Sequence, residues 1–316
     1  MTAIAGPRHC PALEELPPPP PGRTGWPWTV ETAPLPPLRP DGSAWPRVSV
    51  VTPSLNQGEY LEETIRSVLL QGYPDLEYVV ADGGSRDGSV AIIEKYASHL
   101  THWWSRPDRG QSQAINAAFA LCTGSVWGWL NSDDVYVPGT LHRIAEALAG
   151  DSKLVYGSSR FIDAAGQPLG PYPGKPLARG WRRMQYWKGW PVPQPTLFFE
   201  AQVFEDTGAL DESLHYALDY DWVVRASRTV QPLCLPDTLA LYRVHAVSKT
   251  GDWETRKPIF FAEMRAINRR HAPVRSPGSW ALWLSWVGWV AARRVRRAGA
   301  RALALMRDGV KMRRAP

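Results

Sequence analysis

The sequence predicts an α/β fold in which a mostly parallel central sheet is flanked by helices. Between residues 48 and 148, short apolar runs alternate with segments whose apolar residues have helical spacing. Two of the apolar runs end abruptly in acidic residues, at Asp82 and at Asp133, which is typical of strands whose carboxyl ends border a ligand cleft. No fixed-period repeat is visible, so solenoid and propeller folds are not expected.

The first half of the chain is expected to form successive βα units. Its first helix is indicated by Leu61, Ile65 and Val68, which are spaced i, i+4 and i+7. A Gly-Gly-Ser turn after the second strand leads into the next helix. The predicted strands lie at residues 48–51, 76–81, 102–104 and 127–130, and the predicted helices at residues 61–69, 92–96, 112–121 and 141–148.

The second half has a different pattern, with strands predicted at residues 154–156 and 197–199. Loops between residues 166 and 195 are rich in Gly and Pro and dense in Trp and Arg. Within them we expect residues 181–190 to select the second substrate or, equally well, to pack beneath the loops.

The chain divides into four segments by composition. Residues 1–46 hold 13 of the 30 prolines and are expected to form a disordered leader. Residues 47–250 are the predicted α/β domain, with halves at 47–150 and 151–250, and residues 251–278 are a linker or helix. Residues 279–316 are rich in Trp and Arg.

Cysteine usage and the first residues bear on the compartment. Cys10, Cys122 and Cys234 are odd in number and show no zinc-ligand spacing, which favours a reducing environment without structural disulfides. The opening residues lack a basic region followed by an apolar core, so no signal peptide is expected. These observations predict a cytoplasmic domain.

The adjacent carboxylates of Asp133 and Asp134 form the strongest candidate site. Carboxylate oxygens suit Mg²⁺ or Mn²⁺, and such ions are usually held by one or two carboxylates together with substrate phosphates. A metal diphosphate is therefore the expected ligand. The alternative is that Asn-Ser-Asp-Asp only forms a turn and a helix cap ahead of Pro138.

Two further positions are candidates for nucleotide contacts. The first βα junction matches neither the dinucleotide-binding fingerprint nor the phosphate-binding loop, so a different arrangement must hold the nucleotide. Asp82 is placed to accept hydrogen bonds from a base or ribose, and its alternative role is a turn before Gly83. Arg109, just before a predicted helix, is a candidate phosphate ligand or a surface ion pair with Asp108.

Four motifs occur in order: Val-Val-Thr-Pro-Ser-Leu-Asn at 50–56, Ala-Asp-Gly-Gly-Ser-Arg-Asp-Gly-Ser at 81–89, Asp-Arg-Gly-Gln-Ser-Gln-Ala-Ile-Asn at 108–116 and Leu-Asn-Ser-Asp-Asp at 130–134. Together they resemble family 2 glycosyltransferases, which have the nucleotide-sugar-binding GT-A fold. Later segments at 194–199, 218–222 and 242–245 resemble that family too. The resemblance covers about residues 47–250.

The resemblance implies a role for each matching position. Asp134 would be the principal carboxylate for Mn²⁺ or Mg²⁺, and His245 a later metal or diphosphate contact. If the segment around His245 is extended, Arg243 shares its face and suits the same diphosphate. Together with Arg109, the residues expected to bind the donor are Thr52, Pro53, Asp82, Asp133 and Arg243.

Sugar transfer also needs a base for the acceptor hydroxyl, and the resemblance favours Asp219. On a helix Asp221 would point about 200° away from Asp219, so it is expected to be a cap or an ion-pair partner, with Arg225 as a candidate. Direct displacement would invert the anomeric centre. Position 83 is Gly where many relatives have a second Asp, which argues against a two-carboxylate base pocket. The Gln-x-x-Arg-Trp motif of processive synthases is absent, so one sugar per encounter is expected.

The C-terminal segment is expected to lie on a membrane surface. Residues 280–292 are nearly all apolar but fall short of the roughly 20 residues that span a bilayer. From residue 293 onward nine Lys or Arg face a single Asp, and a helix there would place basic and apolar residues on opposite faces. The alternatives are a helix packed on the body and, less favoured, nucleic-acid binding.

These observations predict a metal-dependent, membrane-peripheral glycosyltransferase on the cytoplasmic face. It would transfer one sugar from a nucleoside-diphosphate sugar to a glycan or lipid-linked glycan in cell-surface polysaccharide assembly, and no nucleic-acid partner is expected. One alternative is a sugar-1-phosphate nucleotidyltransferase, although residues 52–54 lack the Gly-rich basic loop that it needs. The other is a non-catalytic nucleotide-sugar or glycan-binding subunit.

Overall fold

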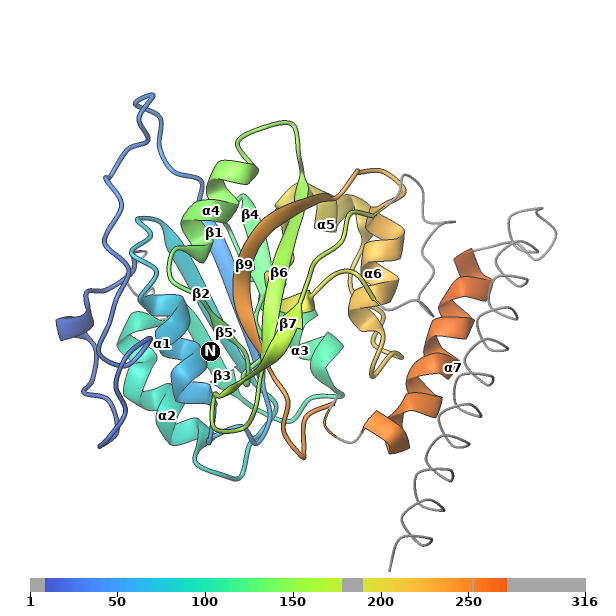
Figure 1. The fold of residues 1–316 in the computed structure, drawn as a ribbon, viewed down its shortest axis with the longest axis horizontal. Coiled ribbons are helices and arrows are strands. Elements are labelled where there is room, and N and C mark those ends of the chain that lie inside the picture. The colour runs from blue at the N-terminus through green and yellow to red at the C-terminus, as the bar shows by residue number, and fades with distance from the viewer. Residues whose placement is uncertain (1–8, 178–189, 250, 252, 272–316) are drawn as a thin grey trace, which may run out of the picture.

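A computed structural model describes residues 9–177, 190–249, 251 and 253–271. Within them one nine-stranded sheet has the order β3-β2-β1-β4-β8-β6-β9-β5, and β7 pairs with β6 (Figure 1). The strands are β1 (Val48–Ser54), β2 (Leu76–Asp82), β3 (His102–Ser105), β4 (Val126–Trp129), β5 (Val135–Tyr136), β6 (Leu154–Ile162), β7 (Pro168–Tyr172), β8 (Phe198–Glu200) and β9 (Leu233–Arg243).

Helices cover both faces of the sheet. The α-helices are α1 (Leu61–Leu69), α2 (Ser89–Tyr96), α3 (Gln111–Phe119), α4 (Thr140–Ala147), α5 (Ala201–Thr207), α6 (Leu218–Ala226) and α7 (Trp253–His271). Short 3₁₀ helices are η1 (Leu13–Glu15), η2 (Ala97–His99) and η5 (Gln194–Thr196). Every helix and strand predicted for the first half is present, with ends that differ by a few residues.

The predicted parallel pairing holds for the first half of the sheet. Strand β1 lies between β2 and β4, β2 pairs with β3, and all three pairings are parallel. The second half is mixed, because β8 runs antiparallel to both β4 and β6 while β6 and β9 are parallel. The carboxyl ends of β1, β2 and β4 therefore meet at one edge, as the sequence predicts.

The two faces of the sheet bury two separate apolar clusters. Val48 and Val50 point to the side of α1, α2 and α4, whereas Val51 points to the side of α3, α5 and α6. This alternation follows from the two-residue period of a strand. Because both faces are covered, the strands of the first half are apolar over most of their length, and Asp82 comes at the end of β2.

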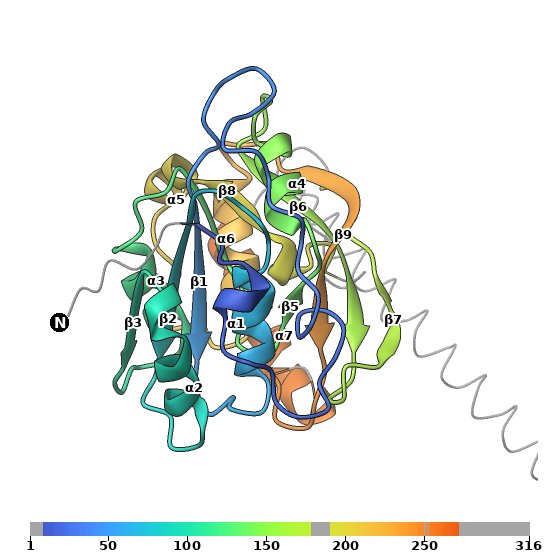
Figure 2. The same cartoon turned by 90° about the vertical axis from the view of Figure 1, so that its left-hand side faces the viewer.

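The leader is the largest difference from the sequence-based expectation. Residues 9–46 contain little helix or strand, yet they pack on the outer side of α1 and are not disordered (Figure 2). Leu16, Trp28 and Trp45 are buried there, and the indole N–H of Trp26 donates to the carbonyl of Tyr136. The expected disordered leader is therefore wrong for residues 9–46, because their aromatic side chains supply enough apolar surface to order a proline-rich segment.

One buried arginine fixes this leader. Arg66 on α1 is fully buried, and its guanidinium donates to the carbonyls of Pro17, Pro27 and Trp28 at 2.8–3.0 Å and to the hydroxyl of Tyr96 at 2.9 Å. Proline-rich chain lacks many N–H donors but keeps every carbonyl, so a planar guanidinium with five N–H groups is a suitable partner. Arg66 thus joins the leader to α1 and α2.

The C-terminal part is described as far as residue 271. Helix α7 occupies Trp253–His271, and the predicted membrane-interfacial segment at 279–316 lies outside the described residues. Among the helices that the structure describes, none has both the length and the hydropathy that are needed to cross a bilayer.

We predict that Arg66→Ala loosens the leader and lowers the free energy of unfolding by about 3 kcal/mol, because buried carbonyls lose charge-assisted donors. Urea denaturation measures the loss, and limited proteolysis should show new cleavage within residues 9–46. Arg86→Ala, which alters an exposed arginine, is the control and should stay within about 0.5 kcal/mol of the parent. Equal stability of the two variants would contradict the conclusion that Arg66 holds the leader against α1 and α2.

Candidate active site

The acidic motif after β4 places two neighbouring carboxylates in opposite environments. The Asp134 side chain is buried, with the residue 1% exposed, and its carboxylate accepts hydrogen bonds from the backbone N–H of Arg243 at 2.9 Å and from Asn131 Nδ2 at 3.3 Å. Burial, together with the charge of Asp133, raises the pKa of Asp134 well above its ordinary value. The Asp133 side chain keeps 16% exposure and lies 3.1 Å from His245 Nε2. Of the two carboxylates, Asp133 is the one available to a ligand.

The surroundings of the two carboxylates differ from what the sequence led us to expect. Sequence comparison made Asp134 the principal metal carboxylate, but its oxygens are already used to anchor the end of β9. Asp133 Oδ2 and His245 Nε2 lie 3.1 Å apart, close enough for both atoms to be ligands of one cation. His245 also packs against Tyr60, with ring centroids 4.5 Å apart. Within the described residues, no group of three or more His, Cys, Asp or Glu side chains could hold a metal. Two protein ligands suit an ion that takes its remaining ligands from a diphosphate.

The guanidinium of Arg243 is enclosed by acceptors from the protein. Arg243 is 1% exposed, and its guanidinium donates to the carbonyls of Asp133, Asp163 and Ala164 and to Glu63 Oε2 at 2.9–3.2 Å. The predicted donor-binding role of Arg243 is therefore not supported, because these acceptors occupy its N–H groups. Sequence spacing placed Arg243 correctly beside His245 but gave no information on the carbonyls that surround it.

The residues expected around the nucleotide lie near the carboxyl ends of β1 and β2, but most of their polar atoms form hydrogen bonds with other protein groups. Thr52 and Pro53 are buried in β1, and Thr52 Oγ1 shares a 2.9 Å hydrogen bond with the hydroxyl of Tyr78. Asp82 is fully buried, and its carboxylate accepts hydrogen bonds from the N–H groups of Gly84 and Ser85 and from the hydroxyls of Ser85 and Ser105. Asp82 therefore has the turn-forming role that the sequence left open as its alternative.

The loop after β1 is locked to the loop after β2. Asn56 has a positive φ of 52°, its N–H donates to Ser85 Oγ at 2.7 Å, and its side-chain oxygen accepts from the N–H of Arg86 at 2.9 Å. Asparagine tolerates this left-handed conformation better than most residues. The two loops thus form one rigid rim at the edge where the nucleotide is expected.

The structure also accounts for Gly83. A Cβ atom built at position 83 would meet Asp108 Oδ2 at 2.8 Å, so a side chain there would displace that carboxylate. Asp108 in turn accepts the N–H of Gly110 at 2.8 Å, which shapes the turn before α3. Arg109 in this turn is exposed and pairs with Glu212 at 2.7 Å instead of with Asp108.

A chain of amide side chains, missed by the sequence analysis, joins three motifs. Gln111 Nε2 donates to Asn131 Oδ1 at 2.6 Å, Asn131 Nδ2 donates to Gln194 Oε1 at 2.9 Å, and Gln194 Nε2 donates to the carbonyl of Trp129 at 2.9 Å. These residues come from α3, from the acidic motif and from η5. Their only signal in the sequence was their position inside the quoted motifs, because hydrogen-bonded amides have no distinctive spacing.

Asp219 lies in the first turn of α6, partly exposed and 3.2 Å from the indole nitrogen of Trp190. Burial of its carboxylate by the surrounding protein raises the pKa of Asp219 to about 6, against the lowering effects of nearby N–H groups and of Lys249. Burial lowers the pKa of Lys249 to about 8, and the carboxylates of Asp219 and Asp133 both oppose this lowering. Asp219 and Asp133 therefore border the same region around Lys249.

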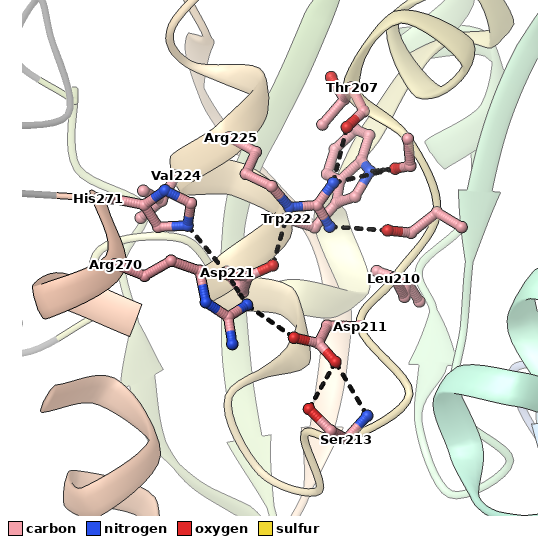
Figure 3. A network of polar contacts seen from close by, with 12 residues as sticks. Thr207, Leu210, Asp211, Ser213, Asp221, Trp222, Val224, Arg225, Arg270 and His271 are labelled. Atoms are coloured by element: carbon pink, nitrogen blue, oxygen red, sulfur yellow. Dashed lines mark hydrogen bonds and ion pairs between the residues drawn. The ribbon is translucent and has the colours of Figure 1, made fainter. Parts of the chain in front are cut away.

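Asp221 forms the ion pair with Arg225 that the sequence offered as a candidate. It is fully buried, and it accepts a hydrogen bond from Arg225 Nε at 2.8 Å and contacts His271 Nε2 at 3.1 Å (Figure 3). The same Arg225 donates to the carbonyls of Thr207, Gly208 and Ala209. Asp221 therefore organises the packing around α6 and is turned away from Asp219.

Comparison with known proteins agrees with this geometry. Residues 49–205 match the model of Glycosyl transferase family 2. Those residues form a family 2 glycosyltransferase domain. An uncharacterized glycosyltransferase of Rickettsia prowazekii is 28% identical over 214 residues, 65% of this chain and 66% of that protein. Escherichia coli chondroitin synthase is 30% identical over 186 residues, which make up 58% of this chain and 26% of the synthase.

Solved structures show the same fold. Staphylococcus aureus TarS in complex with UDP-GlcNAc is 19% identical with a TM-score of 0.58, over 74% of this chain and 68% of that one. The mannosyltransferase PcManGT from Pyrobaculum calidifontis, in complex with GDP-Man and Mn²⁺, is 21% identical with a TM-score of 0.56, over 87% and 82%. The predicted GT-A fold is thereby confirmed, and the glycosyltransferase is favoured over the nucleotidyltransferase alternative.

Proposed function

We propose that this glycosyltransferase moves one sugar from a nucleoside-diphosphate sugar to a glycan or lipid-linked glycan acceptor, with inversion at the anomeric carbon, in cell-surface polysaccharide assembly. The observation that carries the proposal is that a candidate cation site and a candidate base both lie close enough to Lys249 to act on it electrostatically. On one side, Asp133 and His245 offer ligands to a divalent cation. On the other side, Asp219 is a carboxyl group whose pKa is raised towards neutrality.

The donor side of the proposal assigns the cation to Asp133 and His245. A Mn²⁺ or Mg²⁺ ion held there would stabilise negative charge on the departing diphosphate. Asp134 and Arg243 would act indirectly, since they hold the acidic motif against the end of β9. Support comes from the solved relatives of the same fold, one bound to UDP-GlcNAc and one to GDP-Man with Mn²⁺.

The acceptor side of the proposal assigns the general base to Asp219. A base is most effective when its pKa lies near the working pH, and burial brings Asp219 closer to that range than an exposed carboxylate. A carboxylate in this role takes the proton of the acceptor hydroxyl as oxygen attacks the anomeric carbon. A single displacement of this kind inverts the configuration of the sugar.

We predict that the two adjacent aspartates respond differently to the same change. Asp133→Asn should lower nucleoside-diphosphate release in a donor screen with Mn²⁺ or Mg²⁺ by about 10³-fold, because it removes charge that the cation needs. Asp134→Asn is the matched control, since its amide oxygen still accepts the N–H of Arg243 and activity should fall by less than about tenfold. Addition of a chelator to the parent enzyme should reproduce the Asp133→Asn result. An active Asp133→Asn beside an inactive Asp134→Asn would return the metal role to Asp134.

We also predict an acid limit to transfer that is set by Asp219. The base must be deprotonated, so kcat/KM should fall by about tenfold per pH unit below its pKa of about 6 and level off above it. Asp219→Asn should lower kcat by about 10²–10⁴-fold and remove this acid limb from the residual activity. Donor KM serves as the internal control and should change by less than about threefold. An unchanged acid limb in Asp219→Asn would assign the base to another group.

We propose that the segment at 279–316 binds the enzyme to a membrane surface, where a lipid-linked acceptor would lie. The proposal rests on the Trp and Arg pattern of this segment. We predict that a chain ending at residue 278 loses binding to vesicles that contain anionic lipid, because most of the basic excess of the protein is removed. Flotation with anionic and with neutral vesicles measures this, and the parent chain should prefer the anionic ones. Unchanged flotation of the shortened chain would refute the membrane role.

A further inference from the structure

The N-terminus of α6, which carries Asp219, is capped by a residue from another helix. Ala217 occupies the cap position and has no side chain that can accept a hydrogen bond. Instead, the N–H groups of His215, Tyr216 and Ala217 all donate to the carboxylate of Glu263 on α7, each at 2.9 Å. The N–H of Ala217 is one of the free N–H groups at the start of α6, and those of His215 and Tyr216 belong to the turn that leads into it. A carboxylate at this place also interacts favourably with the helix dipole.

The rest of α7 holds α6 from the same side. Met264 and Ile267 are buried in the apolar cluster that also contains α6, and Tyr220 donates from its hydroxyl to Asn268 Oδ1 at 3.1 Å. His271 contacts Asp221 at 3.1 Å, and Arg270 pairs with Asp211 in the loop before α6 at 2.7 Å (Figure 3). Glu263, Ile267 and His271 recur every four residues, so one face of α7 makes these contacts. Figure 1 shows α7 alongside α6.

A second connection runs from Glu263 to Asp219 through Lys249. The ammonium group of Lys249 donates to the carbonyl of His215 and to Gln111 Oε1. The carboxylates of Asp219 and Glu263 both act on Lys249 electrostatically, and Lys249 in turn acts on Asp219. The segment at 215–217 is therefore held by Glu263 at its N–H groups and by Lys249 at one of its carbonyls.

We propose that Glu263 is a positioning residue for Asp219: by capping α6 from α7 it fixes the first helical turn, and with it the carboxylate that accepts the acceptor proton. The inference rests on the proposed role of Asp219 as general base. Glu263 and Asp219 both lie beyond residues 49–205, which match the family model. A displacement of about 1 Å in a catalytic group can cost about 10²-fold in rate, which is why the cap matters for turnover.

The test measures kcat, donor KM and exchange of backbone amides in Glu263→Gln. The amide of glutamine keeps one acceptor oxygen and loses the other, so the three N–H groups are no longer all satisfied. We expect kcat to fall by about tenfold or more, donor KM to stay within about threefold, and amide exchange in a peptide covering residues 215–220 to rise by about tenfold. Glu205→Gln makes the same change at an exposed position on α5 and should leave all three quantities unchanged.

A double-mutant cycle separates positioning from general stabilisation. If Glu263 acts through Asp219, adding Glu263→Gln to Asp219→Asn should not lower the residual activity further. Equal losses in the parent and Asp219→Asn backgrounds would show a merely structural role and overturn the inference, as would an unchanged kcat in Glu263→Gln alone. Full turnover in Asp219→Asn would overturn the proposed base and this inference together, whereas an inactive Asp219→Asn with a fully active Glu263→Gln overturns the inference alone.

Discussion

The junction between the acidic motif and the end of β9 is the contact on which the site depends. Arg243 donates its backbone N–H to the carboxylate of Asp134 and its side-chain Nε–H to the carbonyl of Asp133, so two hydrogen bonds join segments that are 109 and 110 residues apart in the sequence. Glu63 on α1 balances the buried guanidinium. Because His245 follows Arg243 by two residues, this junction sets the distance between His245 and Asp133. Asp133 and His245, the pair proposed to bind the cation, are therefore positioned by the buried contact between Asp134 and Arg243.

Two pairs of aspartates in the enzyme each combine a buried carboxylate with a more exposed one. Asp133 and Asp134 are neighbours, and Asp219 and Asp221 are two apart, yet in each pair one carboxylate is buried against an arginine while the other remains accessible. The buried member needs partners, because an isolated charge in a protein interior is strongly disfavoured. Its hydrogen bonds fix the local backbone and leave the accessible member in a defined place. Asp82 shows what happens when one carboxylate has no such neighbour: four donors engage it and it shapes a turn.

Two segments outside the part that matches the family model support the domain from opposite sides. The leader at 9–46 covers α1 and is held by Arg66, while α7 covers α6 and is held by Glu263 and His271. Both connections use a charged side chain that binds several backbone or side-chain groups at once. Such contacts are specific, because each replaces hydrogen bonds that the backbone would otherwise make to water. The sheet is thus braced on the face of α1 and on the face that carries the proposed base.

The sequence by itself determined the order of helices and strands in the first half of the chain, the parallel first half of the sheet and the edge of the sheet where Asp82 and Asp133 lie. Apolar periodicity and the motif order carry that information, because they reflect local geometry and burial. Only the tertiary structure decided that Asp133 is the more exposed carboxylate of the acidic motif and that Arg243 is enclosed by carbonyls. It also decided that residues 9–46 of the proline-rich leader are ordered. These outcomes depend on partners that are distant in the sequence, such as Glu63, which lies 180 residues from Arg243, and Arg66, which lies 38 residues from Trp28. A local pattern does not contain the position of a distant carbonyl, and for a buried charge that position decides whether it binds a ligand or the protein itself.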